Sequence, residues 1–140
     1  MPTPKFTSLS ESGNGRFCSF FVVGNTGYKL YTSKKRALAC LRTQRFFYKL
    51  GLAPKPGKYF TLKRFNYGWR YGYTTEVADI AENQASYHIY DVLSRMNIKY
   101  WDCAYFNLGT IRGKHVIVDC DPEEFHYKDS LSEFRKLAKV

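Results

Sequence analysis

Two aspartates and an asparagine in the last third of the chain carry oxygen atoms of the kind that metal ions bind. Asp102 and Asp119 lie seventeen residues apart, with Asn107 between them. The chain from 105 to 119, "YFNLGTIRGKHVIVD", has apolar, strand-like residues on both sides of the polar "RGK". We therefore expect a hairpin that returns Asp119 to the neighbourhood of Asp102. Because Mg²⁺ prefers one or two carboxylates completed by water and phosphate oxygens, the pattern predicts a magnesium and phosphate site.

Each of these residues also has a purely structural explanation. Asn107 is a common type of turn residue, and Asp119 with Asp121 would suit a cap before Pro122. For any one residue taken alone the structural explanation is favoured. The combined spacing of two carboxylates and a carboxamide favours a site.

The elements that would position these residues can be read from periodicity and turn signals. "RFCSFFVVG" and "TGYKLY" predict two strands joined by a turn at "GNTG". Ser33 suits a helix N-cap, and the apolar spacing from there to Leu50 is close to 3.6 residues, with Gly51 and Pro54 ending the helix. "YFTLKRFNYGWRYGYTTEVA" predicts two further strands with a turn near residues 66–68.

The second half of the chain continues with a helix and the hairpin described above. "ENQASYHIYDVLSRMN" predicts a helix with Ile89, Val92, Leu93 and Met96 facing inward, and "DSLSEFRKLAKV" predicts a last helix after the hairpin. The order of two strands, a helix, two strands and a helix predicts an α+β fold rather than a doubly wound sheet. We expect one domain from 1 to 140, without linkers or repeats.

The spacing of the polar residues resembles the catalytic core of the protein-kinase-like superfamily. In that family the catalytic loop reads D-x-x-x-x-N, and an apolar strand then delivers the metal-binding aspartate of the D-F-G element. "DCAYFN" and "VIVDCD" match these two motifs. The resemblance implies Asp102 as the catalytic base, Asn107 and Asp119 as metal ligands, and ATP with Mg²⁺ as cofactors. It covers about residues 9 to 121 and is closest to small kinase-like proteins of bacteriophages.

The resemblance also assigns roles upstream of the hairpin. "SGNGRF", with Gly13 and Gly15, resembles a shortened Gly-rich loop, and "GYKLY" places Lys29 where the family has its phosphate-binding lysine. "YGYTTEVA" resembles the strand leading to the hinge that holds adenine through its backbone, which implies Glu76 and Val77 as nucleotide contacts. "NQASYHIYDVLSRMNIKYWD" resembles the helix before the catalytic loop.

Several departures from the family pattern reduce what the resemblance implies. The first helix contains no acidic residue and offers Gln44 where the family has the glutamate that pairs with the lysine. Tyr100 and Trp101 replace the first two residues of H-R-D, and Asp121 replaces the glycine of D-F-G. Only 19 residues follow Asp121, too few for the full helical lobe. We therefore expect a minimal kinase-like fold, with an N-terminal part over about 9–75 and a reduced C-terminal part over about 76–140.

The positive charge is concentrated in the first half of the chain. Residues 12 to 75 contain thirteen lysines and arginines and no acidic residue, while the whole chain has a net charge of +10. Interleaved aromatics such as those of "RFFYK" and "KRFNYGWRYGY" suit a phosphate backbone and stacked bases. The alternative is a solvated basic face with its aromatics turned into the core. We expect this half, beginning with Lys34, Lys35 and Arg36, to meet nucleic acid or an acidic protein.

Composition excludes other classes. No apolar run reaches 18 residues and the N-terminus lacks the order of a signal peptide, so we expect a soluble protein of the cytoplasm, that of the host cell if the protein is viral, without a membrane partner. The four cysteines lack the spacing of a disulfide framework or zinc site, and the three histidines are scattered. Metal ligation by histidine is therefore not expected.

Three functions from different classes remain open. The first is a truncated kinase-like protein that binds a nucleotide with Mg²⁺, its phosphotransfer activity undecided. The second is a catalytically inactive pseudokinase that acts as a binding or inhibitor module for a host protein or nucleoprotein. The third is a basic nucleic-acid-binding domain. The residues do not predict the oligomeric state.

Overall fold

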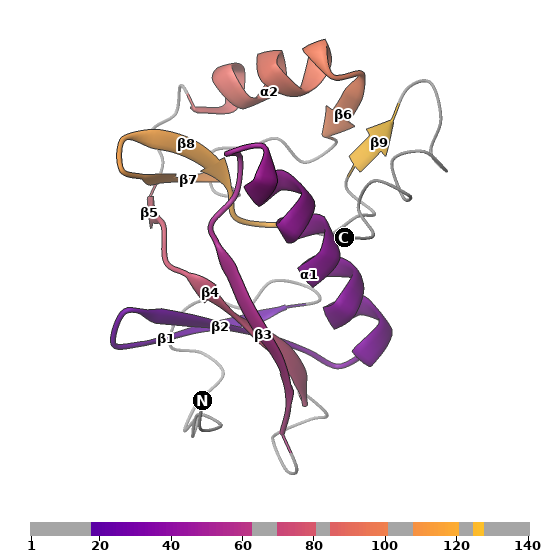
Figure 1. Cartoon of the computed structure of the whole chain (residues 1–140), viewed down its shortest axis with the longest axis vertical. Coiled ribbons are helices and arrows are strands. Elements are labelled where there is room, and N and C mark those ends of the chain that lie inside the picture. The colour runs from indigo at the N-terminus through magenta and orange to yellow at the C-terminus, as the bar shows by residue number, and fades with distance from the viewer. Residues whose placement is uncertain (1–17, 63–69, 81–84, 101–107, 121–124, 128–140) are drawn as a thin grey trace. The chain divides into compact units, whose positions relative to one another are not determined.

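The computed structural model describes residues 18–62, 70–80, 85–100, 108–120 and 125–127 (Figure 1). Within them the chain is α+β, as expected from the sequence. The elements in chain order are β1 (Ser19–Val23), β2 (Thr26–Tyr31), α1 (Lys34–Lys49), β3 (Pro56–Thr61), β4 (Tyr71–Glu76), β5 (Asp79–Ile80), α2 (Ala85–Arg95), β6 (Ile98–Tyr100), β7 (Leu108–Ile111), β8 (Lys114–Ile117) and β9 (Phe125–Tyr127).

The chain divides into two compact units. The first unit comprises residues 1–41 and 55–77, and the second comprises residues 42–54 and 78–140. Residues 42–54, which the sequence analysis placed in the N-terminal part, belong to the second unit. The division falls within α1, so this helix begins in one unit and ends in the other.

The first unit contains a four-stranded antiparallel sheet in the order β1-β2-β4-β3. The predicted β1–β2 hairpin is confirmed, with Val23 paired to Thr26 across a two-residue turn. Gly24 has a φ of 62°, a conformation that glycine adopts without a steric penalty. The inner strands β2 and β4 approach closely at Gly72, where a Cβ atom would overlap the carbonyl oxygen of Lys29.

The core of the first unit lies around the inner strands and the start of α1. Tyr31, Ala37, Cys40, Leu41 and Tyr73 form one buried cluster. The rings of Tyr31 and Tyr73 are stacked, with centroids 6.1 Å apart. Burial raises the pKa of Tyr31 well above its ordinary value, because an ionised phenol would lose its solvation there. This hydroxyl therefore stays neutral and part of the core.

Helix α1 begins and ends where the sequence predicts. Ser33 is the N-cap: its side-chain oxygen accepts a hydrogen bond from the amide of Arg36 at 3.3 Å, and its carbonyl accepts from the amide of Ala37 at 3.0 Å. At the other end Gly51 has a φ of 75°, and the amide of Leu52 donates to the carbonyl of Phe47 at 2.8 Å. This bond satisfies one of the carbonyl groups that have no partner within the helix at its C-terminal end.

The second unit builds a separate core against α2 and the hairpin. In sheet order its three-stranded sheet is β5-β7-β8, and β6 pairs with β9. The buried cluster consists of Phe47, Leu52, Ala53, Ile89, Leu93, Ile98, Tyr100, Leu108, Ile117 and Cys120. Each fully buried aliphatic side chain in it contributes about 1.5–3 kcal/mol. The predicted inward face of α2 is confirmed, because Val92 and Met96 also pack against this cluster.

The predicted hairpin near the C-terminus is confirmed as β7–β8. Its turn is Arg112 and Gly113, both with positive φ (50° and 77°), as a two-residue hairpin turn requires. One prediction is wrong: the helix expected to run on through "NIKYWD" ends at Arg95, Asn97 has a φ of 59°, and Ile98–Tyr100 is a strand. The expected last helix at 129–140 lies outside the described residues. Neither described helix has the length and hydropathy needed to cross a bilayer.

Candidate functional site

The β7–β8 hairpin brings the residues that precede β7 and those that follow β8 to the same end of the two strands. Leu108 pairs with Ile117 at the open end of β7–β8, and Asp119 follows two residues later, half-buried. Asn107 directly precedes Leu108 in the sequence. Asn107 and Asp102 themselves lie outside the described residues. The register thus places Leu108, the first described residue after the stretch 101–107, beside the strand that precedes Asp119.

The entry to the same stretch is fixed by a hydrogen bond to Asp119. Tyr100, the last residue of β6, is buried, and its hydroxyl donates to the main-chain carbonyl of Asp119 at 3.2 Å. Tyr100, which precedes the stretch 101–107, therefore contacts Asp119, and Leu108, which follows it, pairs with Ile117. These two flanking residues lie at the same end of β8.

Further backbone contacts hold this end of β8. The amide of Ile117 donates to the carbonyl of Leu52 at 2.7 Å, which ties the strand to the turn after α1. The thiol of buried Cys120 lies 3.5 Å from the carbonyl oxygen of Ile117. Ile117 itself is fully buried in the core of the second unit. Asp119 is thus carried by a segment that is fixed before and after it.

Lys29 occupies the middle of the sheet in the first unit. On β2 it pairs with Phe20 of β1 and with Tyr73 of β4. The residue is only 7% exposed, and its ammonium lies 5.7 Å from the centroid of the Tyr73 ring. That distance allows a cation–π attraction. The prediction that Lys29 lies on the second strand is confirmed; its role toward phosphate stays a prediction.

The two residues predicted to contact adenine lie at the end of β4. The amide of Glu76 donates to the carbonyl of Lys55 at 2.9 Å, and its side-chain oxygen accepts from the amide of Lys55 at 3.2 Å. Glu76 therefore joins the end of β4 to the start of the β3 segment. Val77 is half-buried in the link between β4 and β5. Gly13 and Gly15 lie outside the described residues.

Gln44 has a structural role that sequence reasoning missed. It is fully buried, and its side-chain nitrogen donates to the carbonyl of Pro54 at 2.9 Å. This bond ties the end of α1 to the loop that follows it. The partner lies ten residues away in a loop, so no periodic signal in the sequence predicts it.

Two of the three histidines lie together, although the sequence shows them scattered. The rings of His88 on α2 and His115 on β8 are 5.4 Å apart between centroids. Two imidazoles provide half of a tetrahedral zinc shell. Among the residues that the structure describes, no group of three or more His, Cys, Asp or Glu side chains could hold a metal ion. The three described cysteines, Cys18, Cys40 and Cys120, form no disulfide.

The residues predicted to meet a partner lie in the first turn of α1. Lys34 and Lys35 are exposed, and Arg36 is half-buried. No residue of that turn is acidic.

Comparison of the chain with protein-family models, with curated proteins and with solved structures finds no match.

Proposed function

We propose that this protein binds a nucleotide with Mg²⁺ in a kinase-like arrangement, in which Asp102, Asn107 and Asp119 converge at the end of β8. The observation that carries the proposal is the hydrogen bond from Tyr100 to the carbonyl of Asp119. Together with the pairing of Leu108 to Ile117, it supports the proposal by holding Tyr100 and Leu108, the described residues on either side of the stretch with Asp102 and Asn107, at the end of β8.

The donor set suits magnesium. The carboxylates of Asp102 and Asp119 and the side-chain oxygen of Asn107 are hard ligands, and Mg²⁺ is commonly held by one or two carboxylates together with substrate phosphates. The position of Asp119 supports this fit, because the residue is half-buried and lies between Ile117 and Cys120, two residues of the packed core. A bound Mg²⁺ would offset the mutual repulsion of the carboxylates and the charge of the phosphates.

From the kinase resemblance we assign Lys29 to the phosphates. Ladders on both sides hold its backbone, and Tyr73 lies beside its ammonium. The ammonium group of a lysine binds phosphate as a compact point charge, without the bidentate geometry of an arginine. A backbone held in place is therefore enough to position it. In the same proposal the backbone of Glu76 and Val77 contacts the adenine ring. Gly13 and Gly15 belong to the loop that would contact the phosphates.

We propose nucleotide binding and leave phosphate transfer open. In active kinases a glutamate of the first helix pairs with the lysine. Helix α1 contains no acidic residue, and the side-chain nitrogen of Gln44 is engaged by Pro54. If a substrate with a hydroxyl group binds, Asp102 is the residue that we assign as its general base, because it matches the aspartate of the D-x-x-x-x-N motif.

Thermal unfolding with and without Mg²⁺-ATP tests the proposal. A ligand that binds only the folded protein stabilises it by about 2.7 kcal/mol at a hundredfold excess over its dissociation constant. We expect a rise in melting temperature with Mg²⁺-ATP that is lost in Asp102→Ala, Asn107→Ala and Asp119→Ala. Each variant should keep the melting temperature of the unliganded wild type, or exceed it, because a polar side chain of the site serves function rather than packing.

Asp91→Asn is the matched control. Asp91 is an exposed acid on α2 that forms an ion pair with Arg95, at 2.7 Å between Oδ2 and the guanidinium nitrogen. This variant should respond to Mg²⁺-ATP as the wild type does. Unfolding of Asp119→Ala in the absence of ligand would show that the residue is a structural cap, and the absence of any shift in the wild type would refute nucleotide binding.

A further inference from the structure

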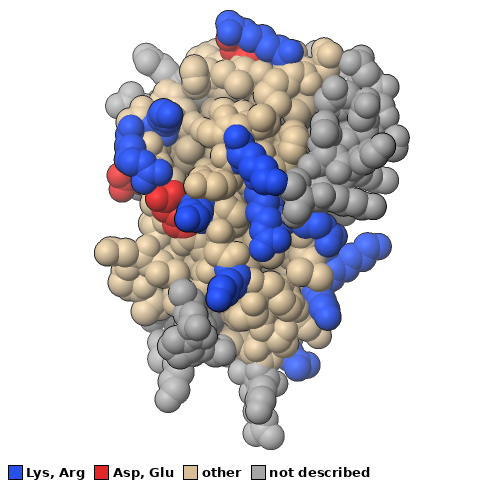
Figure 2. All heavy atoms as spheres, in the orientation of Figure 1, with Lys and Arg blue, Asp and Glu red and all other residues tan. Residues whose placement is uncertain are grey.

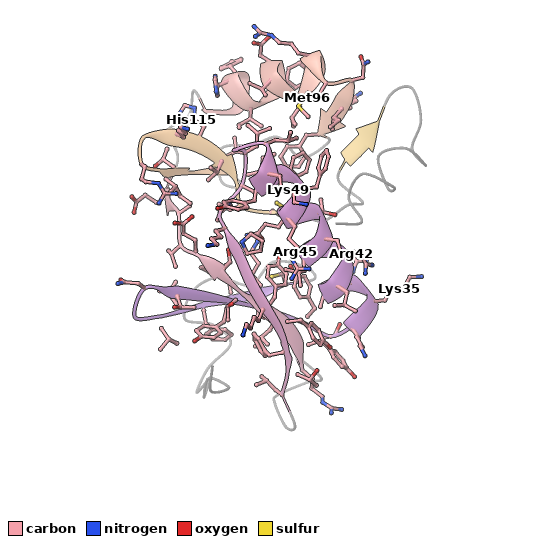
Figure 3. The ribbon with its side chains drawn as sticks, in the orientation of Figure 1. Lys35, Arg42, Arg45, Lys49, Met96 and His115 are labelled. Carbon is pink, nitrogen blue, oxygen red and sulfur yellow. The ribbon has the colours of Figure 1, made fainter. Side chains whose placement is uncertain are left out.

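Helix α1 carries a row of positive charges along one side. Lys35, Arg42, Arg45 and Lys49, here called the cationic stripe, are separated by seven, three and four residues. With 3.6 residues per turn these spacings place all four on one face of the helix. Figure 3 labels them along α1.

The stripe faces away from the packed side of α1. The buried residues of the helix are Ala37, Cys40, Leu41, Thr43, Gln44 and Phe47, on the opposite side. Lys35 and Lys49 are exposed, and Arg42 and Arg45 are half-buried. Figure 2 shows lysine and arginine side chains spread over the face in view, with few acidic side chains among them.

Most charges of α1 work against the helix, and Lys49, a cation in the last turn, is the exception. Its first turn holds three cations and no acid, at the end where the helix dipole is positive. Within the stripe, Arg42 with Arg45 and Arg45 with Lys49 are like charges at three and four residues, a spacing at which they repel. No ion pair joins a residue of the stripe to an acidic side chain among the described residues. The pattern therefore lowers helix stability, and folding alone does not explain it.

The stripe has the chemistry of a phosphate-binding surface rather than of a protein interface. Protein interfaces depend on a few desolvated aromatic or arginine anchors around a packed centre. Of the described large hydrophobic side chains that are exposed, Tyr48 is the one on α1, in its last turn. Lysines and arginines without acidic neighbours instead gain affinity for nucleic acid by releasing its counterions.

The length of the stripe favours a duplex. Lys35 and Lys49 are fourteen residues apart, which corresponds to about 21 Å along the helix. Duplex DNA presents about one negative charge per 1.7 Å of its axis, so a helix face of this length can meet several phosphates. Binding of single strands relies on several exposed aromatic platforms interleaved with the cations, whereas Tyr48 alone offers one among the described residues of α1.

We propose that the cationic stripe of α1 binds the phosphate backbone of a nucleic-acid duplex without reading its sequence. None of the four residues of the stripe is among those assigned to the nucleotide. Of the three residues predicted from the sequence to meet a partner, Lys35 belongs to the stripe, while Lys34 and Arg36 flank it at the start of the helix.

Binding of a fluorescent duplex of about twenty base pairs, measured by anisotropy over a series of salt concentrations, tests this proposal. If four phosphates are neutralised, the logarithm of the association constant should fall with the logarithm of salt concentration with a slope of about −3.6. Affinity should then drop on the order of 100-fold between about 50 and 200 mM salt.

Two double variants locate the contact. Arg42→Gln with Arg45→Gln should weaken binding at low salt and bring the slope to about −1.8, because two phosphate contacts are lost. Lys58→Gln with Lys114→Gln removes the same charge from two exposed positions on β3 and β8 and should leave the slope near the wild-type value. Circular dichroism should show both variants folded.

Four results would overturn the proposal. These are no binding at about 50 mM salt, an affinity indifferent to salt, an equal loss in both double variants, and tighter binding to a single strand of the same length than to the duplex. Poly-glutamate provides the comparison with an acidic protein. If it binds the stripe as tightly as the duplex does, the surface takes acidic proteins instead and the proposal is wrong.

Discussion

The end of β8 and the cationic stripe of α1 are built in opposite ways. At the end of β8, a hydroxyl, a backbone amide and a thiol hold the chain on both sides of Asp119. Along the stripe, the charged groups are joined to no described acid and extend from the outer side of a helix. A chain fixed by its own contacts suits a small ligand that needs defined geometry, whereas an open row of charges suits a large, uniformly charged one.

Truncating Ile117, the core residue two positions before Asp119, should have the largest effect on stability. Ile117 is fully buried, so Ile117→Ala should lower the free energy of unfolding by about 2–5 kcal/mol, measured by urea denaturation. Leu50→Ala, at a 45% exposed position after α1, is the control and should cost far less. Equal losses at the two positions would mean that the end of β8 is not the packed region described here.

Loss of the Tyr100 hydroxyl should separate positioning from packing. Tyr100→Phe keeps the buried ring and removes the bond to the carbonyl of Asp119, so it should cost about 0.5–1.5 kcal/mol of stability. If the bond also positions the stretch 101–107, the affinity for Mg²⁺-ATP should fall at least tenfold in isothermal titration. Tyr90→Phe, at an exposed position on α2, should change neither quantity. Unchanged nucleotide affinity in Tyr100→Phe would limit this bond to a structural role.

Reversing one charge of the stripe should have a smaller effect, of opposite sign. Arg45→Glu replaces a repulsive pair by a glutamate four residues before Lys49, the favourable orientation in a helix. The free energy of unfolding should rise by a few tenths of a kcal/mol or stay unchanged, while duplex binding weakens strongly. A clear loss of stability would show that Arg45 serves the fold, and the argument from unfavourable charges would fail.

The elements with strong local signals were predictable from the sequence. Two-residue turns fixed both hairpins, and Ser33 with Gly51 set the limits of α1. The short strands β5, β6 and β9 were missed because two or three residues show no periodicity. Their pairing comes from partners far along the chain, as when Tyr100 pairs with Phe125.

The candidate site was predictable in its residue types but not in its supports. The apolar residues on both sides of "RGK" predicted a hairpin between Asn107 and Asp119, and the register of β7 with β8 confirms the hairpin. The bond from Tyr100 to Asp119 joins residues nineteen positions apart through a hydroxyl and a carbonyl, which no spacing rule identifies. The stripe on α1 could have been read from the sequence, since its spacing is regular. The run of three cations at the start of the helix is the more conspicuous local signal, and the predicted partner surface was placed there instead.

Replacing Mg²⁺ by paramagnetic Mn²⁺ in a nuclear magnetic resonance titration with ATP tests the central claim most directly. If the nucleotide's metal is held at the end of β8, the amide signals of Tyr100, Leu108 and Cys120 should broaden first, at a small fraction of one equivalent. The broadening should require ATP and disappear in Asp119→Ala. Broadening centred instead on His88 and His115, or none at these positions, would contradict the assignment of the nucleotide site.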